Sequence, residues 1–239
     1  MMHTYEYPRP AVVTDVVAFT IHGSALQVLL IQRANEPYKG AWALPGGFVG
    51  VDEDLDEAAL RELHEETGLE GVGMEQLYAF GAPDRVPGQR VIAIAYCAIV
   101  PSHRAEVRAA SDAAAARWWD VTRVPRLAFD HAEMLALAHE RLRLGVARSV
   151  AAAHFLRPEF SLSELAGAQQ AVLGRAVDPS LARRYLGRAD GFEPVPSSIS
   201  ATQRDDRPYR LASPSRLGLL CVAGGELQDL GTPPIESQI

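Results

Sequence analysis

Hydrophobic and polar residues follow two different spacings in the first 149 residues. Residues 12–21 and 26–31 are runs of apolar, largely β-branched residues, and His22-Gly23-Ser24 between them is a plausible hairpin turn. The pattern therefore predicts two paired strands. Further short strands are predicted at residues 77–80, 91–100 and 116–119.

A second spacing predicts helices. Residues 54–67 read as a helix that ends before Gly68, a typical position just past a helix end. Residues 129–142 carry apolar side chains every three to four positions and predict a closing helix. Residues 42–49 enter a glycine-rich turn. Mixed strands and helices favour an α/β domain over residues 1–149.

The pattern changes in residues 150–216. Ser161 and Glu164 have the spacing of a capping box, so a helix is predicted over residues 161–173, before Gly174. Asp178 or Ser180 would cap a second helix that runs to Arg188. Extended segments follow near residues 192–195 and 208–212. Helix, turn, helix and hairpin form the outline of a small winged helix-turn-helix domain, and residues 217–239 are expected to be a flexible acidic tail.

Composition narrows the function classes. The chain has 239 residues, with 23 Lys+Arg against 30 Asp+Glu and a net charge of −7. Residues 150–216 carry nine basic and seven acidic residues, far from a strong nucleic-acid footprint. Cys97 and Cys221 are too far apart to indicate a disulfide framework or a zinc site, which fits a reducing cytoplasm. The apolar run at 91–100 is too short to span a bilayer, and the N-terminus lacks the order of a signal peptide, so a cytoplasmic protein without a membrane partner is expected.

Candidate chemistry is concentrated in residues 47–69. On a helix, Glu62 lies three residues before Glu65 and four before Glu66, so the three carboxylates project from one face. A hard divalent ion such as Mg²⁺ is the natural partner of clustered carboxylates. The alternative is a solvated acidic helix face, and the fixed glycine, arginine and leucine positions around the glutamates favour the metal site.

The same residues resemble the Nudix box, G-x5-E-x7-R-E-U-x-E-E-x-G-U, at every specified position. The resemblance implies an α/β/α Nudix fold with a mixed sheet and Mg²⁺- or Mn²⁺-dependent cleavage of a diphosphate linked to a nucleoside. It makes Glu62, Glu65 and Glu66 catalytic metal ligands, with Glu65 or Glu66 as the candidate base. Further residues that it implies are a metal-ligand or turn-forming Gly47 and supporting Glu53 and Arg61.

Residues 7–17, 42–49 and 127–131 resemble ADP-ribose pyrophosphatases and the regulators related to them. The expected ligand is therefore an ADP-ribose-like nucleotide. The residues expected to contact it are Arg33, Trp42, Phe48 and Arg85. Two positions depart from the pattern of these relatives, because Val86 and Ala115 stand where charged residues are usual.

In the second block, residues 160–165, 172–175, 183–184 and 207–211 resemble the winged-helix half of Nudix-related regulators of NAD metabolism. The resemblance implies binding to double-stranded DNA as a homodimer. Arginines would contact phosphates or guanine edges, and the alternative is that they pair with Asp190, Asp205 and Asp206. The arginines expected at the DNA are Arg183, Arg184, Arg188, Arg204, Arg207 and Arg210.

Two hypotheses of different class follow. In one, the protein is a metabolite-responsive transcriptional regulator whose Nudix domain binds ADP-ribose or a related nucleotide and keeps a competent hydrolase site. In the other, it is primarily an enzyme that cleaves ADP-ribose to AMP and ribose 5-phosphate, and its second domain serves in dimerisation or structure. The intact box favours retained chemistry, whereas the second block favours regulation.

Overall fold

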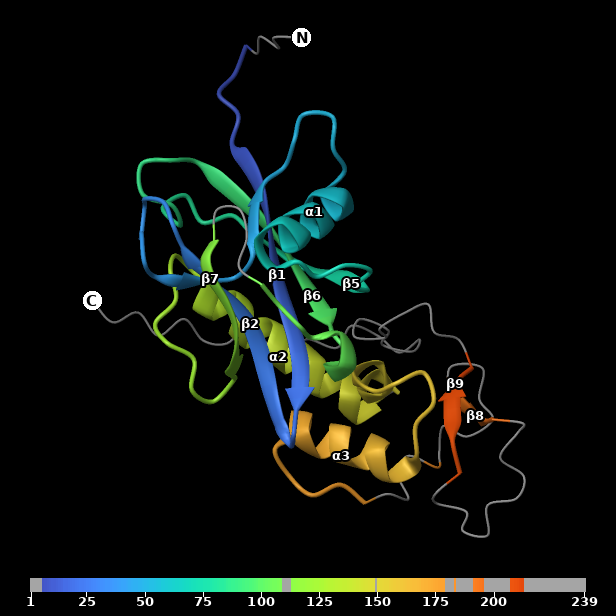
Figure 1. Cartoon of the computed structure of the whole chain (residues 1–239). Helices are drawn as coiled ribbons and strands as arrows, with labels where there is room; N and C mark the ends of the chain where they lie inside the picture. The colour runs from blue at the N-terminus through green and yellow to red at the C-terminus, as the bar shows by residue number, and fades with distance from the viewer. Residues whose placement is uncertain are drawn as a thin grey trace.

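A computed structural model describes residues 6–108, 113–148, 150–178, 183, 191–195 and 207–212 (Figure 1). Within these residues no helix is long and apolar enough to cross a membrane. The helices are α1 (Leu55–Thr67), α2 (His131–Arg148) and α3 (Leu162–Leu173), with 3-10 turns η1 (Ser102–Arg104) and η2 (Ala151–Phe155). The strands are β1 (Ala11–His22), β2 (Ala25–Arg33), β3 (Trp42–Ala43), β4 (Gly46–Phe48), β5 (Met74–Phe80), β6 (Val91–Ile99), β7 (Ala113–Asp120), β8 (Phe192–Pro194) and β9 (Tyr209–Leu211).

The first seven strands of the described chain form one mixed sheet. Its central order is β3-β2-β1-β6-β5, with β4 paired to β1 and β7 paired to β2. β1 and β6 are parallel, whereas the other pairs are antiparallel. The predicted hairpin turn at residues 22–24 joins β1 to β2. The predicted α/β class is confirmed.

Alternate residues of β1 supply two separate cores. Val17 and Phe19 belong to the cluster that includes α2, and Val16 and Ala18 to the cluster that includes α1. This period of two follows from the pleat of a strand, which turns successive side chains to opposite faces. α1 and α2 therefore cover opposite faces of the sheet, as Figure 1 shows. The result is a three-layer α/β/α arrangement.

Helix α1 forms where the sequence predicts it. The Asp54 side chain accepts from the Asp56 N–H, and Asp54 and Glu57 form a reciprocal capping box. The helix ends at Gly68, which adopts the left-handed conformation at φ 75°. Leu63 is buried against the sheet. Burial of this face fixes the direction in which the glutamates of the helix point.

The second block shows two of its predicted parts. Helix α3 begins after a reciprocal capping box of Ser161 and Glu164 and ends at left-handed Gly174. β8 and β9 pair as an antiparallel hairpin. The predicted second helix lies outside the described residues apart from Asp178 and Arg183, and so does the tail at 217–239.

The two blocks share a hydrophobic core. The cluster on the α2 face of the sheet includes Leu142 of α2, Phe155 of η2, Leu165 of α3 and Phe192 of β8. α3 lies against α2 and β2. The expected boundary between residues 149 and 150 is therefore crossed by side-chain packing, and the division into domains stays a prediction.

This shared core predicts one cooperative unfolding transition. Leu165 is 1% exposed, and Leu165→Ala should lower the free energy of unfolding by about 2–5 kcal/mol because it leaves a cavity. The three tryptophans, at 42, 118 and 119, all lie in the first block, so their fluorescence reports that block alone. Urea transitions followed by tryptophan fluorescence and by far-UV circular dichroism should coincide and shift together.

The matched control is Leu60→Ala on α1, where the side chain is 41% exposed and the change should stay within about 0.5 kcal/mol. A circular dichroism transition that precedes the fluorescence transition would show that the second block unfolds by itself.

Candidate functional site

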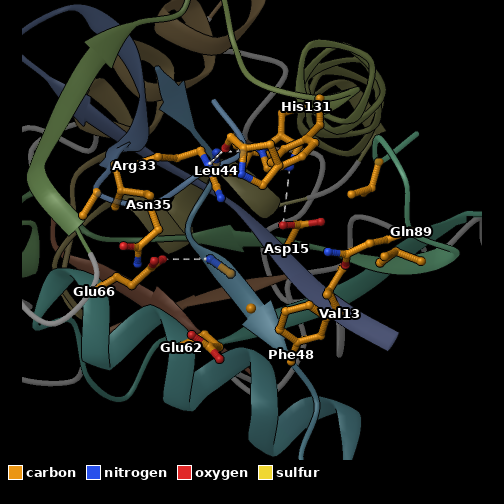
Figure 2. A pocket seen from close by; sticks show the side chains of 18 of the residues that line it. Val13, Asp15, Arg33, Asn35, Leu44, Phe48, Glu62, Glu66, Gln89 and His131 are labelled. Carbon is orange, nitrogen blue, oxygen red and sulfur yellow. Dashed lines mark hydrogen bonds and ion pairs between the residues drawn. The ribbon is translucent and has the colours of Figure 1, made fainter. Parts of the chain in front are cut away.

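A pocket of about 420 Å³ opens between α1 and the start of α2 (Figure 2). Its walls come from strands β1, β2 and β4, helix α1, the loop after β2, the segment before β6 and the beginning of α2. Its polar lining residues include Asp15, Arg33, Asn35, Glu36, Glu62, Glu65, Glu66, Arg85, Gln89 and His131.

Two glycines of β4 let the strand lie directly against the neighbouring groups. A Cβ placed on Gly47 would collide with the carboxylate of Glu62, and one on Gly46 would collide with the Thr14 carbonyl oxygen. The Gly46 N–H donates to Glu66 Oε2 over 2.9 Å. The glycines at 46 and 47 therefore allow β4 to lie against the box glutamates.

Arg61 ties the acidic residues of the site together. Its Nε donates to Glu53 Oε1 over 2.6 Å and its Nη2 to Glu53 Oε2 over 2.9 Å, a bidentate pair. Its Nη1 donates to Glu62 over 2.8 Å and to Glu65 over 3.1 Å. Nη2 also donates to the Phe48 carbonyl over 3.0 Å. Arg61 thereby fixes carboxylates that would otherwise repel one another.

The carboxylates differ in their affinity for protons. The hydrogen bonds from Arg61 and from the Gly50 N–H hold the pKa of Glu53 at about 2. Burial raises the pKa of Glu66 to about 8, and nearby Glu62 adds to the rise. Burial also raises the pKa of Glu62. Ionising Glu62 and Glu66 therefore costs free energy, and a nearby cation would offset that cost.

The donor set suits a hard divalent cation, because all three box glutamates offer carboxylate oxygen to one pocket. Burial raises the pKa values of Glu62 and Glu66, so a cation would stabilise their ionised forms. The side chains are not gathered around one point, however. Among the described residues no group of three or more His, Cys, Asp or Glu side chains is placed to hold a metal ion. Arg61 holds Glu62 and Glu65, and the Gly46 N–H holds Glu66.

A second polar group forms the inner wall. His131 Nδ1 accepts the Leu44 N–H over 2.9 Å, so a neutral His131 carries its proton on Nε2. This nitrogen lies 3.7 Å from Asp15 Oδ1. Burial is the largest cause that lowers the pKa of His131, and it raises the pKa of Asp15. Arg85 donates to Asp130 over 2.9 and 2.7 Å.

The four residues expected to contact the substrate lie in different places. Arg33 lines the pocket, donates to the Pro37 carbonyl over 2.9 Å and stacks its guanidinium over Phe129 at 4.9 Å. Phe48 lines the pocket and is 59% exposed. Arg85 also lines it, but its side chain is only 2% exposed and is engaged by Asp130.

Trp42 is not among the residues that line the pocket. It packs edge-on against Trp119, with ring centroids 5.2 Å apart. This pairing follows from the strands, since β3 and β7 flank β2 on its two sides. Of the two departures from the family pattern, Val86 lines the pocket, whereas Ala115 pairs with Gln32 on the sheet.

Arginines of the second block are described at three of the six expected positions. Arg183 lies on the surface. Arg207 is half-buried, and the described residues provide no hydrogen-bond partner for its buried Nε. Arg210 donates to Glu193 Oε1 over 2.9 and 2.8 Å across the β8–β9 hairpin. Arg184, Arg188 and Arg204 lie outside the described residues.

Sequence reasoning overlooked several lining residues, notably Asp15, Asn35, Gln89 and His131. One signal was available for Asp15. It is the sole charged residue in the apolar run 12–21, and a charge inside a buried strand demands a partner or a function. His131 is the first residue of α2, and only the folded chain places it in the pocket wall.

Comparison with known proteins agrees with this geometry. Residues 11–138 match the NUDIX domain family, which covers more than half of the chain. The chain belongs to the Nudix family. The sheet flanked by α1 and α2 is therefore a Nudix fold, and a smaller C-terminal unit follows it.

Three similar proteins extend beyond the family. The ADPR-responsive transcriptional repressor NtrR of Acinetobacter baylyi is 31% identical over 211 residues, which cover 87% of this chain and 84% of that protein. The ADP-ribose pyrophosphatase of Methanocaldococcus jannaschii is 40% identical over 54% of this chain and 73% of its own length. The structure of Shewanella oneidensis NrtR complexed with a 27mer DNA has a TM-score of 0.70 and 30% identity, and it covers 84% of this chain and 93% of that one.

Buried His131 contributes stability that is lost in acid. Burial holds the pKa of His131 in the folded protein below its ordinary value of 6.5. Below about pH 6.5, this side chain is therefore protonated more fully in the unfolded chain than in the folded one. Stability is therefore lost as pH falls, by up to about 1.4 kcal/mol per pH unit from this group. Asp15, Asp130, Arg85 and Arg33 are the charged groups that surround it. In urea unfolding, the free energy of unfolding of the wild type should fall relative to that of His131→Asn as the pH is lowered from 7 to 5.

Asparagine keeps an acceptor for the Leu44 N–H without adding a titrating group. The control is the same substitution at a histidine on the surface, His103→Asn, because His103 is exposed on η1 and does not line the pocket. Equal pH slopes for the wild type and His131→Asn would contradict the prediction.

Proposed function

We propose that the protein is a metabolite-responsive transcriptional regulator that binds ADP-ribose or a related nucleoside diphosphate derivative, and that its Nudix site keeps Mg²⁺-dependent pyrophosphohydrolase activity. The observation that carries this proposal is the 31% identity to an ADPR-responsive repressor over 87% of the chain, through both blocks. A match confined to the Nudix domain would favour an enzyme alone.

The pocket suits such a ligand. Its volume of about 420 Å³ lies in the usual range for small-molecule sites. The box glutamates line it together with Arg33 and Phe129, which offer a cation and an aromatic ring. A nucleoside diphosphate derivative has matching parts, namely an anionic diphosphate and flanking sugars with a base.

For hydrolysis, Glu62, Glu65 and Glu66 would hold the cation, with Gly47 supplying a backbone oxygen. A bound Mg²⁺ or Mn²⁺ would neutralise phosphate oxygens and lower the pKa of a coordinated water. Arg61, fixed by its bidentate pair with Glu53, positions Glu62 and Glu65. Glu65 or Glu66 would accept the proton of the attacking water.

For regulation, helix α2 offers a direct connection between the two blocks. Its first residue, His131, lines the pocket, and its later residue Leu142 shares a core with Leu165 of α3. A ligand that displaces the start of α2 would therefore move the surface on which α3 packs. Such coupling is reciprocal, so DNA and ligand would change each other's affinity by the same factor.

DNA contact would come from arginines of the second block, acting in a homodimer. Of the two described arginines at the β8–β9 hairpin, Arg207 is the better candidate, because Glu193 already engages Arg210. The alternative function is a Nudix hydrolase whose second block serves only in dimerisation or structure. It is favoured by the 40% identity to an ADP-ribose pyrophosphatase over the Nudix part.

Enzyme activity is tested with ADP-ribose and Mg²⁺. The wild type should release AMP, and Glu66→Gln should lower the rate at least about 100-fold, since it removes a metal-binding carboxylate and a candidate base. AMP is quantified by chromatography over a time course.

The matched control is Glu140→Gln on the exposed face of α2, which should keep the wild-type rate. Absence of AMP, together with a rise in melting temperature on adding ADP-ribose, would indicate a sensor that has lost the reaction. Neither AMP nor a thermal shift would contradict the proposed ligand.

DNA binding is tested by fluorescence anisotropy on duplexes from promoters of neighbouring genes. Binding should be sequence-specific and should weaken steeply with salt, because phosphate contacts release counterions. ADP-ribose should change the affinity. Arg207→Ala should weaken binding and lower the salt slope by about one.

Arg108→Ala is the control for the change in net charge, because Arg108 lies on the Nudix domain with an 82% exposed side chain. Equal losses in the two variants would assign the effect to net charge. No specific binding to any of the promoters would favour the hydrolase alternative.

A further inference from the structure

A buried carboxylate in the pocket wall lacks a hydrogen-bond partner. Asp15 Oδ2 is one of the buried side-chain atoms for which the described residues provide none. The Asp15 side chain is 7% exposed, and it lines the pocket. A buried polar group left unpaired is costly, so a carboxylate at a ligand site is expected to gain its partner from the ligand.

The groups around Asp15 hold it without satisfying it. His131 Nε2 lies 3.7 Å from Oδ1, and Arg85 Nη2 lies 3.8 Å from Oδ2. Both distances exceed that of an ordinary hydrogen bond. Arg85 is committed to Asp130, and His131 is held through its other nitrogen by Leu44. Asp15 is thus fixed in place with its acceptor capacity unused, and Figure 2 shows it facing the pocket.

The kind of group that Asp15 would accept from follows from charge. A diphosphate is repelled by a carboxylate and carries no donor at neutral pH. A metal ion is disfavoured, because the Arg85 guanidinium lies beside the carboxylate. The partner is therefore a neutral donor, such as a hydroxyl.

The position of Asp15 in the pocket indicates which hydroxyl groups of the ligand it could contact. Gly46 adjoins both carboxylates: its N–H donates to Glu66 over 2.9 Å, and a Cβ placed on it would lie 2.8 Å from Asp15 Oδ1. A group at Asp15 is consequently next to the place where the box glutamates would hold a diphosphate. In ADP-ribose the groups next to the diphosphate are the two riboses, and the base lies one sugar further away.

We infer that Asp15 is a specificity-determining residue that accepts a hydrogen bond from a ribose hydroxyl of the bound nucleotide, positioned by His131 and Arg85. This inference rests on the proposed ligand class and assigns a role to a residue outside the Nudix box. Asp15 thereby distinguishes a ribose from a deoxygenated sugar beside the diphosphate.

The test is calorimetric titration of the full chain with ADP-ribose and two analogues. One analogue lacks the 2′- and 3′-hydroxyls of the adenosine ribose, and the other lacks the 2- and 3-hydroxyls of the terminal ribose. Titrations are run with and without Mg²⁺, and AMP is quantified afterwards so that only intact ligand is counted. The wild type should bind one analogue roughly ten- to a hundredfold more weakly than ADP-ribose, as expected for a lost hydrogen bond to a charged acceptor. The analogue that loses affinity identifies which ribose Asp15 contacts.

Asp15→Asn keeps the shape and removes the charge. It should bind ADP-ribose about tenfold more weakly than the wild type, yet bind the sensitive analogue within about twofold of the wild type. The control is Thr20→Val on the same strand, because buried Thr20 donates to the Val100 carbonyl over 2.8 Å and does not line the pocket. It should lower stability and leave the ratio of the two affinities unchanged.

An Asp15→Asn variant that lowers both affinities by the same factor overturns the inference, because a structural defect would act on every ligand alike. The same holds if neither analogue binds the wild type more weakly than ADP-ribose does, a result that requires no variant to fold. In both cases ADP-ribose still binds and the proposed function stands. A wild type that does not bind ADP-ribose overturns the proposed ligand itself.

Discussion

The close approach of strand β4 to helix α1 is the constraint on which the site depends. A Cβ on Gly47 would collide with the Glu62 carboxylate, and a Cβ on Gly46 would collide with the Thr14 carbonyl oxygen. Because β4 also pairs with β1, these contacts set the depth at which the helix sits over the sheet. The box glutamates and the pocket wall are consequently brought to one place by a backbone that carries no side chains there.

Crowded carboxylates are then made tolerable in two ways. On the outer side, Arg61 distributes its donors over Glu53, Glu62 and Glu65, so that one guanidinium screens three acids. On the inner side, Glu66 accepts a hydrogen bond from the Gly46 N–H, and burial raises its pKa to about 8, which favours the neutral form. The clustered, partly buried carboxylates are costly to ionise. A bound cation would lower that cost, so the site favours a cation and its phosphate ligand.

Helix α2 connects the pocket to the C-terminal unit. It begins at the pocket with His131, covers the sheet, and continues into the core that η2, α3 and β8 share. A change at its first turn therefore reaches the C-terminal unit through packed side chains. This continuity supports the proposed coupling between the pocket and the C-terminal unit, because a flexible linker would not transmit such a change.

The sequence by itself determined most of the elements and the acidic helix, whereas the short strands β3 and β4 lie where only a glycine-rich turn was predicted. Asp54 caps the start of α1 and Gly68 its end, and both caps depend on local backbone geometry alone. A spacing of three and four residues places the glutamates on one face of the helix. The tertiary structure decided the rest. Trp42 packs in the sheet against Trp119, and Asp15 meets His131 from the opposite end of the first block, because strand pairing and helix docking join residues that are distant in sequence. Local spacing carries no information about such contacts, so the inner wall of the pocket became visible only in the folded chain.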